Sequence, residues 1–274
     1  MTANLLYMKK VNIKWFYLII LSIIWGSSFI LIKKSLIGLT PYQIGSLRNV
    51  LSGIILIAFA CKGLKKIDKI KWKWIIISGL LGSFFPAFLF AIAETEIDSS
   101  VTSILNSLVP LNTVLMGAAI FKIASTKRQV IGVIIGFVGT AILILKGADI
   151  NPNQNYLYAS YIIVATLMYA ANVNIIKRHL QTVKPLTIAA GNYVFIIIPA
   201  LVVLFFTDFF TAKTFESDPF YESLIYICIL LVFGTALAKV FFFKLVQIIS
   251  KCTFRISKPS AIWSKVKVFP KQPS

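Results

Sequence analysis

The sequence predicts an all-α integral membrane protein, and two observations support that fold class. Of the 274 residues, 58% are hydrophobic and only 14% are charged, which leaves too little polar surface to cover a water-soluble globule. The apolar residues also come in long unbroken runs and do not alternate with polar ones. Because a bilayer forces every backbone N–H and C=O to be paired, only helices or a closed barrel can span it, and unbroken runs favour helices.

Eight stretches of the chain are long and apolar enough to cross a bilayer. Six of them contain no charged residue, and the other two contain one cation each, Arg48 and Lys239. In chain order, the predicted spans are residues 15–32, 42–61, 74–93, 99–121, 129–145, 156–176, 186–207 and 224–243. The sequence therefore predicts about eight transmembrane helices.

The charges predict which ends of these spans face the cytoplasm, because Lys and Arg collect in cytoplasmic segments of membrane proteins. With the N-terminus inside, eight of the nine acidic residues, all but Asp68, fall outside. Most of the Lys and Arg then fall in the inner segments, which are 9–14, 62–73, 122–128, 177–184 and the tail after 243. We therefore predict a multi-pass protein of the bacterial plasma (inner) membrane with a cytoplasmic N-terminus. The net charge of +19 is interpreted as topology and not as a nucleic-acid surface.

A few charged residues do not fit this simple pattern. Lys33 and Lys34 lie at the outer end of the first span, where they could face a watery cavity, but we expect them to extend to the outer headgroups. Lys239 lies four residues from the inner end of its span, and we expect it to reach that interface in the same way. Glu94 begins an outer acidic cluster; we expect a solvated loop there, with proton coupling as the alternative.

Enzyme chemistry finds little support in the sequence. The three cysteines, Cys61, Cys228 and Cys252, are scattered, and His179 is the single histidine. These residues cannot build a zinc site or a catalytic triad. No Walker sequence is present either. We therefore expect no metal, no cofactor and no catalytic residue.

The chain contains an internal repeat. A shift of 144 residues aligns Trp25 with Tyr169, Lys33-Lys34 with Lys177-Arg178, Pro41 with Pro185 and Arg48 with Asn192. Further along the chain, a shift of 152 residues aligns Gly82 with Gly234 and Phe90 with Phe242. Residues 1–150 form the first copy, with five predicted spans, and residues 151–250 form the second copy, with three. Because five is odd, the second copy enters the membrane from the opposite face, which makes this an inverted repeat.

Several short motifs resemble one transporter family. Ile24–Phe29 reads IWGSSF, Thr40-Pro41 precedes Arg48, Leu105–Pro110 ends in proline, and Gly132–Gly139 is rich in glycine. In order and spacing, these segments resemble EamA-type members of the drug/metabolite transporter superfamily. The resemblance implies a ten-helix fold of two five-helix repeats with a central cavity, and export or exchange of metabolites or drugs.

The tail departs from that pattern. By the repeat, the second copy should continue with a counterpart of residues 99–145, but residues 251–274 contain six cations, no acid and no apolar run of spanning length. The sequence thus predicts a basic tail that does not span the membrane, with helices nine and ten absent. A frameshift or truncation of a ten-helix gene is the hypothesis that follows.

The predicted substrate site lies between the two repeats, near the midplane of the membrane. Arg48 could bind an anionic group there, or it could pair structurally or extend outward; the resemblance, which places an arginine here too, favours the cavity. Polar residues on the spans could bind substrate or join helices to one another, and Pro86 and Pro110 could each free a backbone carbonyl. The candidate residues are Trp25, Ser28, Arg48, Asn106, Pro110, Tyr169 and Asn172.

The predicted function is secondary transport of small metabolites or drugs by alternating access between the inverted repeats. The alternative is a membrane remnant that does not transport because it lacks the last two helices. The expected partners are a small-molecule substrate and membrane lipid, with a coupling ion and a homodimer left open. Gly132, Gly136 and Gly139 would allow close helix packing, either within the bundle or between subunits.

Overall fold

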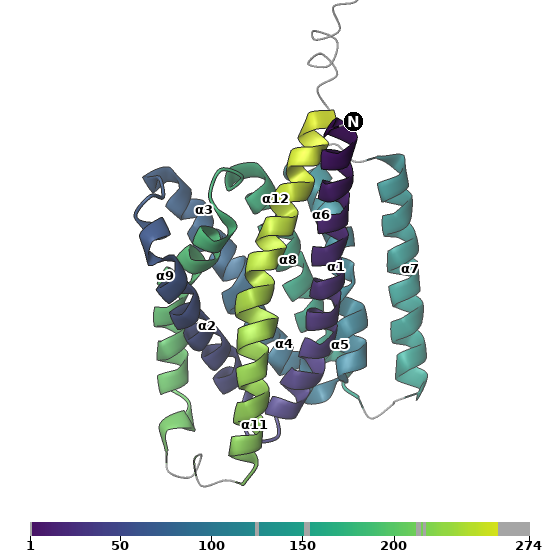
Figure 1. The fold of residues 1–274 in the computed structure, drawn as a ribbon. Helices are drawn as coiled ribbons and strands as arrows, with labels where there is room; N and C mark the ends of the chain where they lie inside the picture. The colour runs from purple at the N-terminus through teal and green to yellow at the C-terminus, as the bar shows by residue number, and fades with distance from the viewer. Residues whose placement is uncertain (1, 124–125, 151–153, 212–214, 216–217, 257–274) are drawn as a thin grey trace, which may run out of the picture.

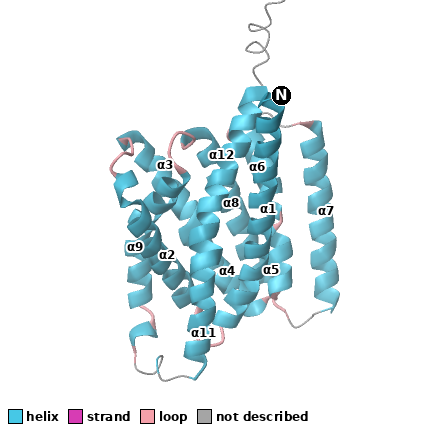
Figure 2. Cartoon of the chain, viewed as in Figure 1, coloured by secondary structure: helices cyan, strands magenta, loops and turns pink. Residues whose placement is uncertain are grey.

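The computed structural model describes residues 2–123, 126–150, 154–211, 215 and 218–256. Helices make up almost all of these residues, and short loops join them (Figure 2). None of the described residues forms a strand. The predicted all-α fold class is confirmed.

The helices follow one another along the chain in two sets. The first set consists of α1 (Thr2–Ser35), α2 (Pro41–Leu64), α3 (Lys69–Gly79), η1 (Leu80–Phe84), α4 (Phe85–Glu96), α5 (Ser99–Asn106), α6 (Leu108–Ala119) and α7 (Lys127–Ile150). The second set consists of η2 (Tyr156–Tyr158), α8 (Ala159–His179), α9 (Pro185–Phe205), η3 (Asp208–Phe210), α11 (Asp218–Ile229), η4 (Leu230–Leu237) and α12 (Ala238–Ile256). The η1 and η4 segments are π-helical and continue directly into their neighbours.

Long helices account for each predicted span. Within the described residues, seven helical segments are long and apolar enough to cross a membrane. The remaining predicted span, 129–145, lies within α7, which has 24 residues and therefore measures about 36 Å at about 1.5 Å per residue. The chain is a multi-pass membrane protein. Residues 257–274, most of the predicted basic tail, lie outside the described residues.

A proline lies in the first turn of both α2 and α9, and a capping box further stabilises the start of α2. Thr40 forms a capping box with Gln43, in which each side chain bonds the other residue's backbone N–H. Pro41 and Pro185 each occupy the first turn of their helix, where a missing N–H has no cost because that position has no partner in the helix. These two prolines are 144 residues apart.

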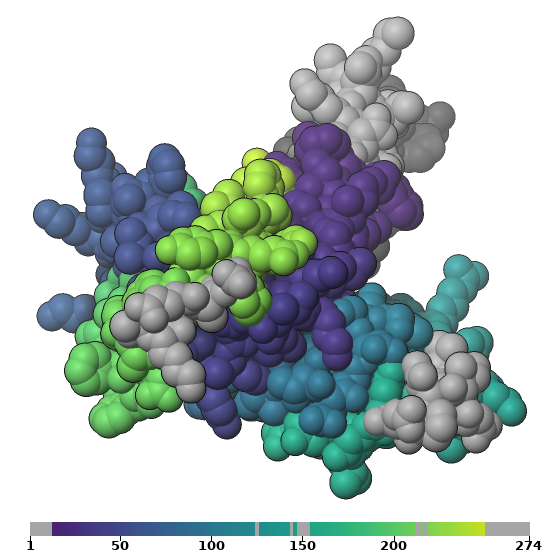
Figure 3. All heavy atoms as spheres, turned by 90° about the horizontal axis from the view of Figure 1, so that it is seen from below, coloured from purple at the N-terminus to yellow at the C-terminus, as the bar shows by residue number. Residues whose placement is uncertain are grey.

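The α2–α9 pair has the most extensive contact between any two elements and lies at the left of the bundle in Figure 1. Helix α1 packs against α11 and α12, and α8 packs against α3 and α4. Seen from below, α11 lies beside α1, and α7 forms a far edge of the molecule (Figure 3). The first helix of each predicted repeat thus contacts the third span of the other repeat.

Helix α7 stands at the periphery. It contacts α6, and a Cβ added at Gly136 would lie 2.5 Å from the Leu111 side chain. A Cβ at Gly132 or Gly139 would meet no atom within 4 Å. Of the predicted close-packing glycines, Gly136 therefore packs within the bundle, and the other two face no neighbour in the described chain.

Two glycines of the π-helical segments sit against the first helices of the opposite repeats. A Cβ at Gly82 of η1 would lie 2.1 Å from Nδ2 of Asn172 on α8, and a Cβ at Gly234 of η4 would lie 2.7 Å from Oγ of Ser28 on α1. Gly82 and Gly234 correspond under the shift of 152, and Ser28 and Asn172 correspond under the shift of 144. The same contact therefore occurs twice, with the roles of the two halves exchanged.

The close contact between Gly82 and Asn172 predicts a measurable loss of stability when Gly82 is replaced by a larger residue. Asn172 is held in place because it is buried and its Oδ1 accepts a bond of 2.6 Å from Ser78. We therefore expect Gly82→Ala to lower the free energy of unfolding by about 1–3 kcal/mol, measured by denaturation in mixed micelles. Gly26→Ala, where a Cβ meets nothing within 4 Å, serves as the control and should not destabilise. In an Asn172→Ala background the cost of Gly82→Ala should shrink; an unchanged cost would contradict the contact.

Candidate functional site

Polar residues lie between two apolar clusters in the interior of the bundle. The first cluster reaches Leu47 on α2 and Ala165 on α8, and the second resumes at Leu56 on α2 and Val173 on α8. Arg48 follows directly after the first cluster on α2. Part of the polar interior of the bundle, including Arg48, therefore lies between the two apolar clusters.

We call one set of these residues the central polar cluster: Arg48 of α2, Ser83 of η1, Tyr193 of α9, Thr235 of η4 and Lys239 of α12. Arg48 lies close enough to both Tyr193 and Lys239 to interact with them electrostatically. The members come from both predicted repeats, so the cluster lies where the two halves of the chain meet.

Arg48 points into the bundle. Its neighbours one turn away on α2, Ile44 and Ser52, are both fully buried, and residues four apart share a helix face. The Arg48 side chain is half-buried, and its Nε and Nη2 each donate to Oγ1 of Thr235 at 3.4 Å. Both bonds are at the long end of the normal range, so the guanidinium is held loosely.

Lys239 corrects an expectation from the sequence. It does not extend to the membrane interface; its side chain is 7% exposed, and its Nζ donates to the carbonyl oxygen of Gly82 at 3.0 Å. The ammonium also lies 5.0 Å from the ring centre of Tyr193 and 5.8 Å from that of Phe243, within the range of cation–π attraction.

Pro86 explains why the Gly82 carbonyl can accept this bond. In an α-helix, the carbonyl of residue 82 accepts from the N–H of residue 86, but proline has no N–H. The π-helical turn η1 lies immediately before this proline. Pro86 cannot donate to the Gly82 carbonyl, and Lys239 does so from another helix, so an element of the second half is bonded to the first half.

The hydroxyls of Tyr193 and Ser83 lie close to each other in the central polar cluster. Tyr193 is fully buried and Ser83 is 7% exposed, and neither hydroxyl has a hydrogen-bond partner within 3.5 Å among the described residues. Buried polar atoms without partners are rare and call for an explanation, such as a bound ligand. Sequence reasoning missed Tyr193, although it is the only tyrosine in the predicted span 186–207.

Glu94 also corrects an expectation. It lies at the end of α4 and is fully buried, not solvated in an outer loop. One carboxylate oxygen, Oε2, accepts from Ser99 at 3.2 Å, and the other has no partner among the described residues. Glu94 is also close enough to Arg48 for electrostatic interaction.

Lys33 does not extend to the headgroups as expected. Its Nζ donates to the backbone carbonyl oxygens of Glu94 at 2.7 Å and Ile97 at 3.2 Å. The last carbonyls of a helix have no partner within the helix and attract cations, so Lys33 caps the end of α4. Lys34 is exposed, as expected.

The candidate residues on the first helix of each repeat differ in their surroundings. Trp25 is half-buried and packs edge to face against Phe242, with ring centres 5.2 Å apart. Ser28 is buried against Gly234 and donates to its own helix at Ile24. On α8, Asn172 is buried against Gly82 as described above. Ser28 and Asn172 therefore serve close helix packing in this conformation.

The remaining candidates are spread over two regions. Tyr169 is half-buried, stacks on Phe90 with ring centres 5.9 Å apart, and interacts electrostatically with Arg48, so it borders the central polar cluster. Asn106 ends α5 with an Oδ1 that has no partner among the described residues. Pro110 is exposed on α6. The structure thus brings Arg48 and Tyr169 together and leaves Pro110 apart.

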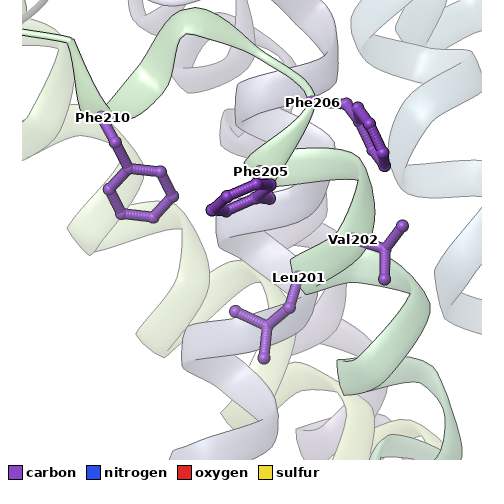
Figure 4. A pocket seen from close by; sticks show the side chains of 5 residues that line it. All are labelled: Leu201, Val202, Phe205, Phe206 and Phe210. Atoms are coloured by element: carbon purple, nitrogen blue, oxygen red, sulfur yellow. The ribbon is translucent and has the colours of Figure 1, made fainter.

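A shallow apolar hollow lies away from this site, on the outside of α9 (Figure 4). Its volume is about 300 Å³, and it is lined by Leu201, Val202, Phe205, Phe206 and Phe210. Phe205 and Phe206 are 74% and 84% exposed. Such a surface offers no polar group to orient a ligand and is suited to contact with lipid tails.

Comparison with known proteins finds sequence similarity to transporters. A model described as the EamA-like transporter family matches residues 13–145. A protein of Archaeoglobus fulgidus described as an uncharacterized transporter is 28% identical over 191 residues, which cover 68% of this chain and 65% of the relative. The matched part of the chain therefore spans 65% of that relative's length, which is less than two thirds.

Proposed function

We propose that this multi-pass membrane protein is a transporter of the EamA-like family, whose model matches residues 13–145, and that it moves a small metabolite or drug across the membrane by alternating access. The substrate binds at the central polar cluster, between the two predicted repeats. Rocking of one repeat against the other opens this site to each side in turn.

The observation that carries this proposal is the exchanged pair of glycine contacts. Gly82 meets Asn172, and Gly234 meets Ser28, so each half offers its π-helical segment to the first helix of the other half. An inverted repeat produces such an arrangement, because its two copies are related by a two-fold axis in the membrane plane. Where corresponding helices of the two copies exchange the same contact, the bundle can open to one side or to the other in equivalent ways.

Arg48 and Lys239 are the residues that we propose bind the substrate, with Tyr169 and Tyr193 beside them. Charged groups within membrane spans are costly and are retained where they line a substrate path. Trp25 and Asn106 would border the site in other conformations of the cycle. We leave a coupling ion as part of the proposal, with Glu94 the buried carboxyl available to carry a proton.

The test is export by cells. A bacterial host that expresses the chain should release at least one small metabolite into the medium faster than the same host with an empty vector. Profiling of metabolites in the medium over time measures this. If protein is present in the membrane and no compound differs, the chain does not transport by itself, and the alternative of a non-transporting remnant would hold.

A further inference from the structure

The central polar cluster contains more hydrogen-bond donors and positive charge than its own acceptors can match. A guanidinium has five N–H donors and an ammonium three. Arg48 is bonded to one hydroxyl oxygen, that of Thr235, and Lys239 to one carbonyl oxygen, that of Gly82. The unpartnered hydroxyls of Ser83 and Tyr193 add further possible donors.

No carboxylate of the described residues neutralises these two cations. Among those residues, neither Arg48 nor Lys239 has an acidic oxygen within 4.0 Å. Glu94 interacts with Arg48 only at longer range, and its carboxylate is bonded to Ser99 near the end of α4. An arginine cannot shed its proton in a protein, so the charge of Arg48 persists within the membrane, where isolated charges are unfavourable.

We infer that the site takes a small organic anion, a carboxylate-bearing metabolite, whose charged group binds between Arg48 and Lys239. This inference rests on the proposed function and names its substrate class. A carboxylate has two oxygens and accepts bonds in several directions, so it supplies the acceptors that the cluster lacks. The aromatic rings of Tyr193 and Phe243, already beside the Lys239 ammonium, leave an apolar wall for the rest of the molecule.

Binding of this anion would also act on the contact between the two halves. Lys239 now joins α12 to η1 through the Gly82 carbonyl. A carboxylate is a stronger acceptor for an ammonium than a neutral carbonyl, so the anion would compete for Lys239. Occupation of the site would thus weaken a bond that holds the two halves in the present arrangement.

Acid and amide pairs of the same shape test the inference on the purified chain. The probes are phenylacetate with phenylacetamide, benzoate with benzamide, and succinate with succinamide, each at millimolar concentration and equal ionic strength. We expect at least one acid to raise the Tm of the chain by about 3 °C or more above the effect of its amide. This preference should vanish in Arg48→Gln and be at least halved in Lys239→Gln.

Lys244→Gln is the matched control, because Lys244 is an exposed cation on the same helix as Lys239, five residues further along. It should keep the full preference for the acid. The inference is overturned if no acid exceeds its amide, or if the preference survives Arg48→Gln. Should Arg48→Gln not fold, Lys239→Gln decides alone, and an undiminished preference there overturns the inference.

The two proposals fail in different ways. If cells export a neutral or cationic compound while the purified chain prefers no acid, transport stands and the substrate class is wrong. If the purified chain binds an acid but cells export nothing, the anion site stands and the transport proposal fails.

Discussion

Arg48→Gln is expected to lower export at least about 30-fold while leaving the amount of protein in the membrane unchanged. Truncation of one partner of a buried charged hydrogen bond typically costs about 2–5 kcal/mol, and 2 kcal/mol corresponds to about 30-fold. Arg48 faces inward and makes only two long hydrogen bonds, both to Thr235. Its guanidinium therefore has N–H donors available to bind a substrate. Glutamine keeps a polar donor but removes the charge.

Insertion should survive this change, because removal of an intramembrane charge relieves a cost of about 2.5–3.5 kcal/mol. The measurement is the export rate of the released metabolite, normalised to the amount of protein in isolated membranes. Lys62→Gln is the control, since Lys62 is an exposed cation in the last turn of the same helix. Export that is unchanged in Arg48→Gln would remove this residue from the substrate site.

A reversible bond between α6 and α8 is expected to stop transport. Asn112 Nδ2 donates to Thr166 Oγ1 at 2.9 Å, and both side chains are buried. The two helices belong to different predicted repeats. Cysteines at both positions, in a chain with Cys61, Cys228 and Cys252 replaced by serine, are expected to form a disulfide on oxidation, because the hydrogen bond places the two native side chains in direct contact.

If the halves rock against each other, this disulfide holds them together and should reduce export by about tenfold or more, and a reducing agent should restore it. Each single cysteine variant, treated with the same oxidant, should be unaffected. The readout is the export rate before oxidation, after it and after reduction. Full export by the oxidised double variant, with the disulfide confirmed by mass spectrometry, would exclude relative movement of α6 and α8 during transport.

The elements of the fold were predictable from short-range signals. Long apolar runs located the spans, and Pro41 and Pro185 marked the starts of α2 and α9, because proline is suited to the first turn of a helix. The shifts of 144 and 152 residues also predict which positions of the two copies correspond. These signals are local. Each depends only on neighbouring residues, and the length of an apolar run can be compared directly with the known thickness of a bilayer.

The surroundings of single charged residues were not predictable in the same way. Lys239, Glu94 and Lys33 were each expected near solvent or headgroups, because a long or terminal charged side chain can usually reach them. The structure instead gives each a specific backbone or side-chain partner contributed by another helix. Such partners depend on tertiary contact, although Pro86 offered one clue, since it leaves the carbonyl of Gly82 without its helical donor.

The predicted repeat has a direct consequence for topology, because equivalent loops must lie on opposite faces of the membrane. Ile37, 55% exposed in the loop after α1, and Lys184, exposed in the loop before α9, belong to equivalent loops of the two copies. Each can carry a single cysteine in the chain without native cysteines, and a membrane-impermeant maleimide reports its side in intact cells. We expect labelling of Ile37→Cys in intact cells and of Lys184→Cys only after permeabilisation. Labelling of both from the same side would contradict the inverted repeat and the transport mechanism built on it.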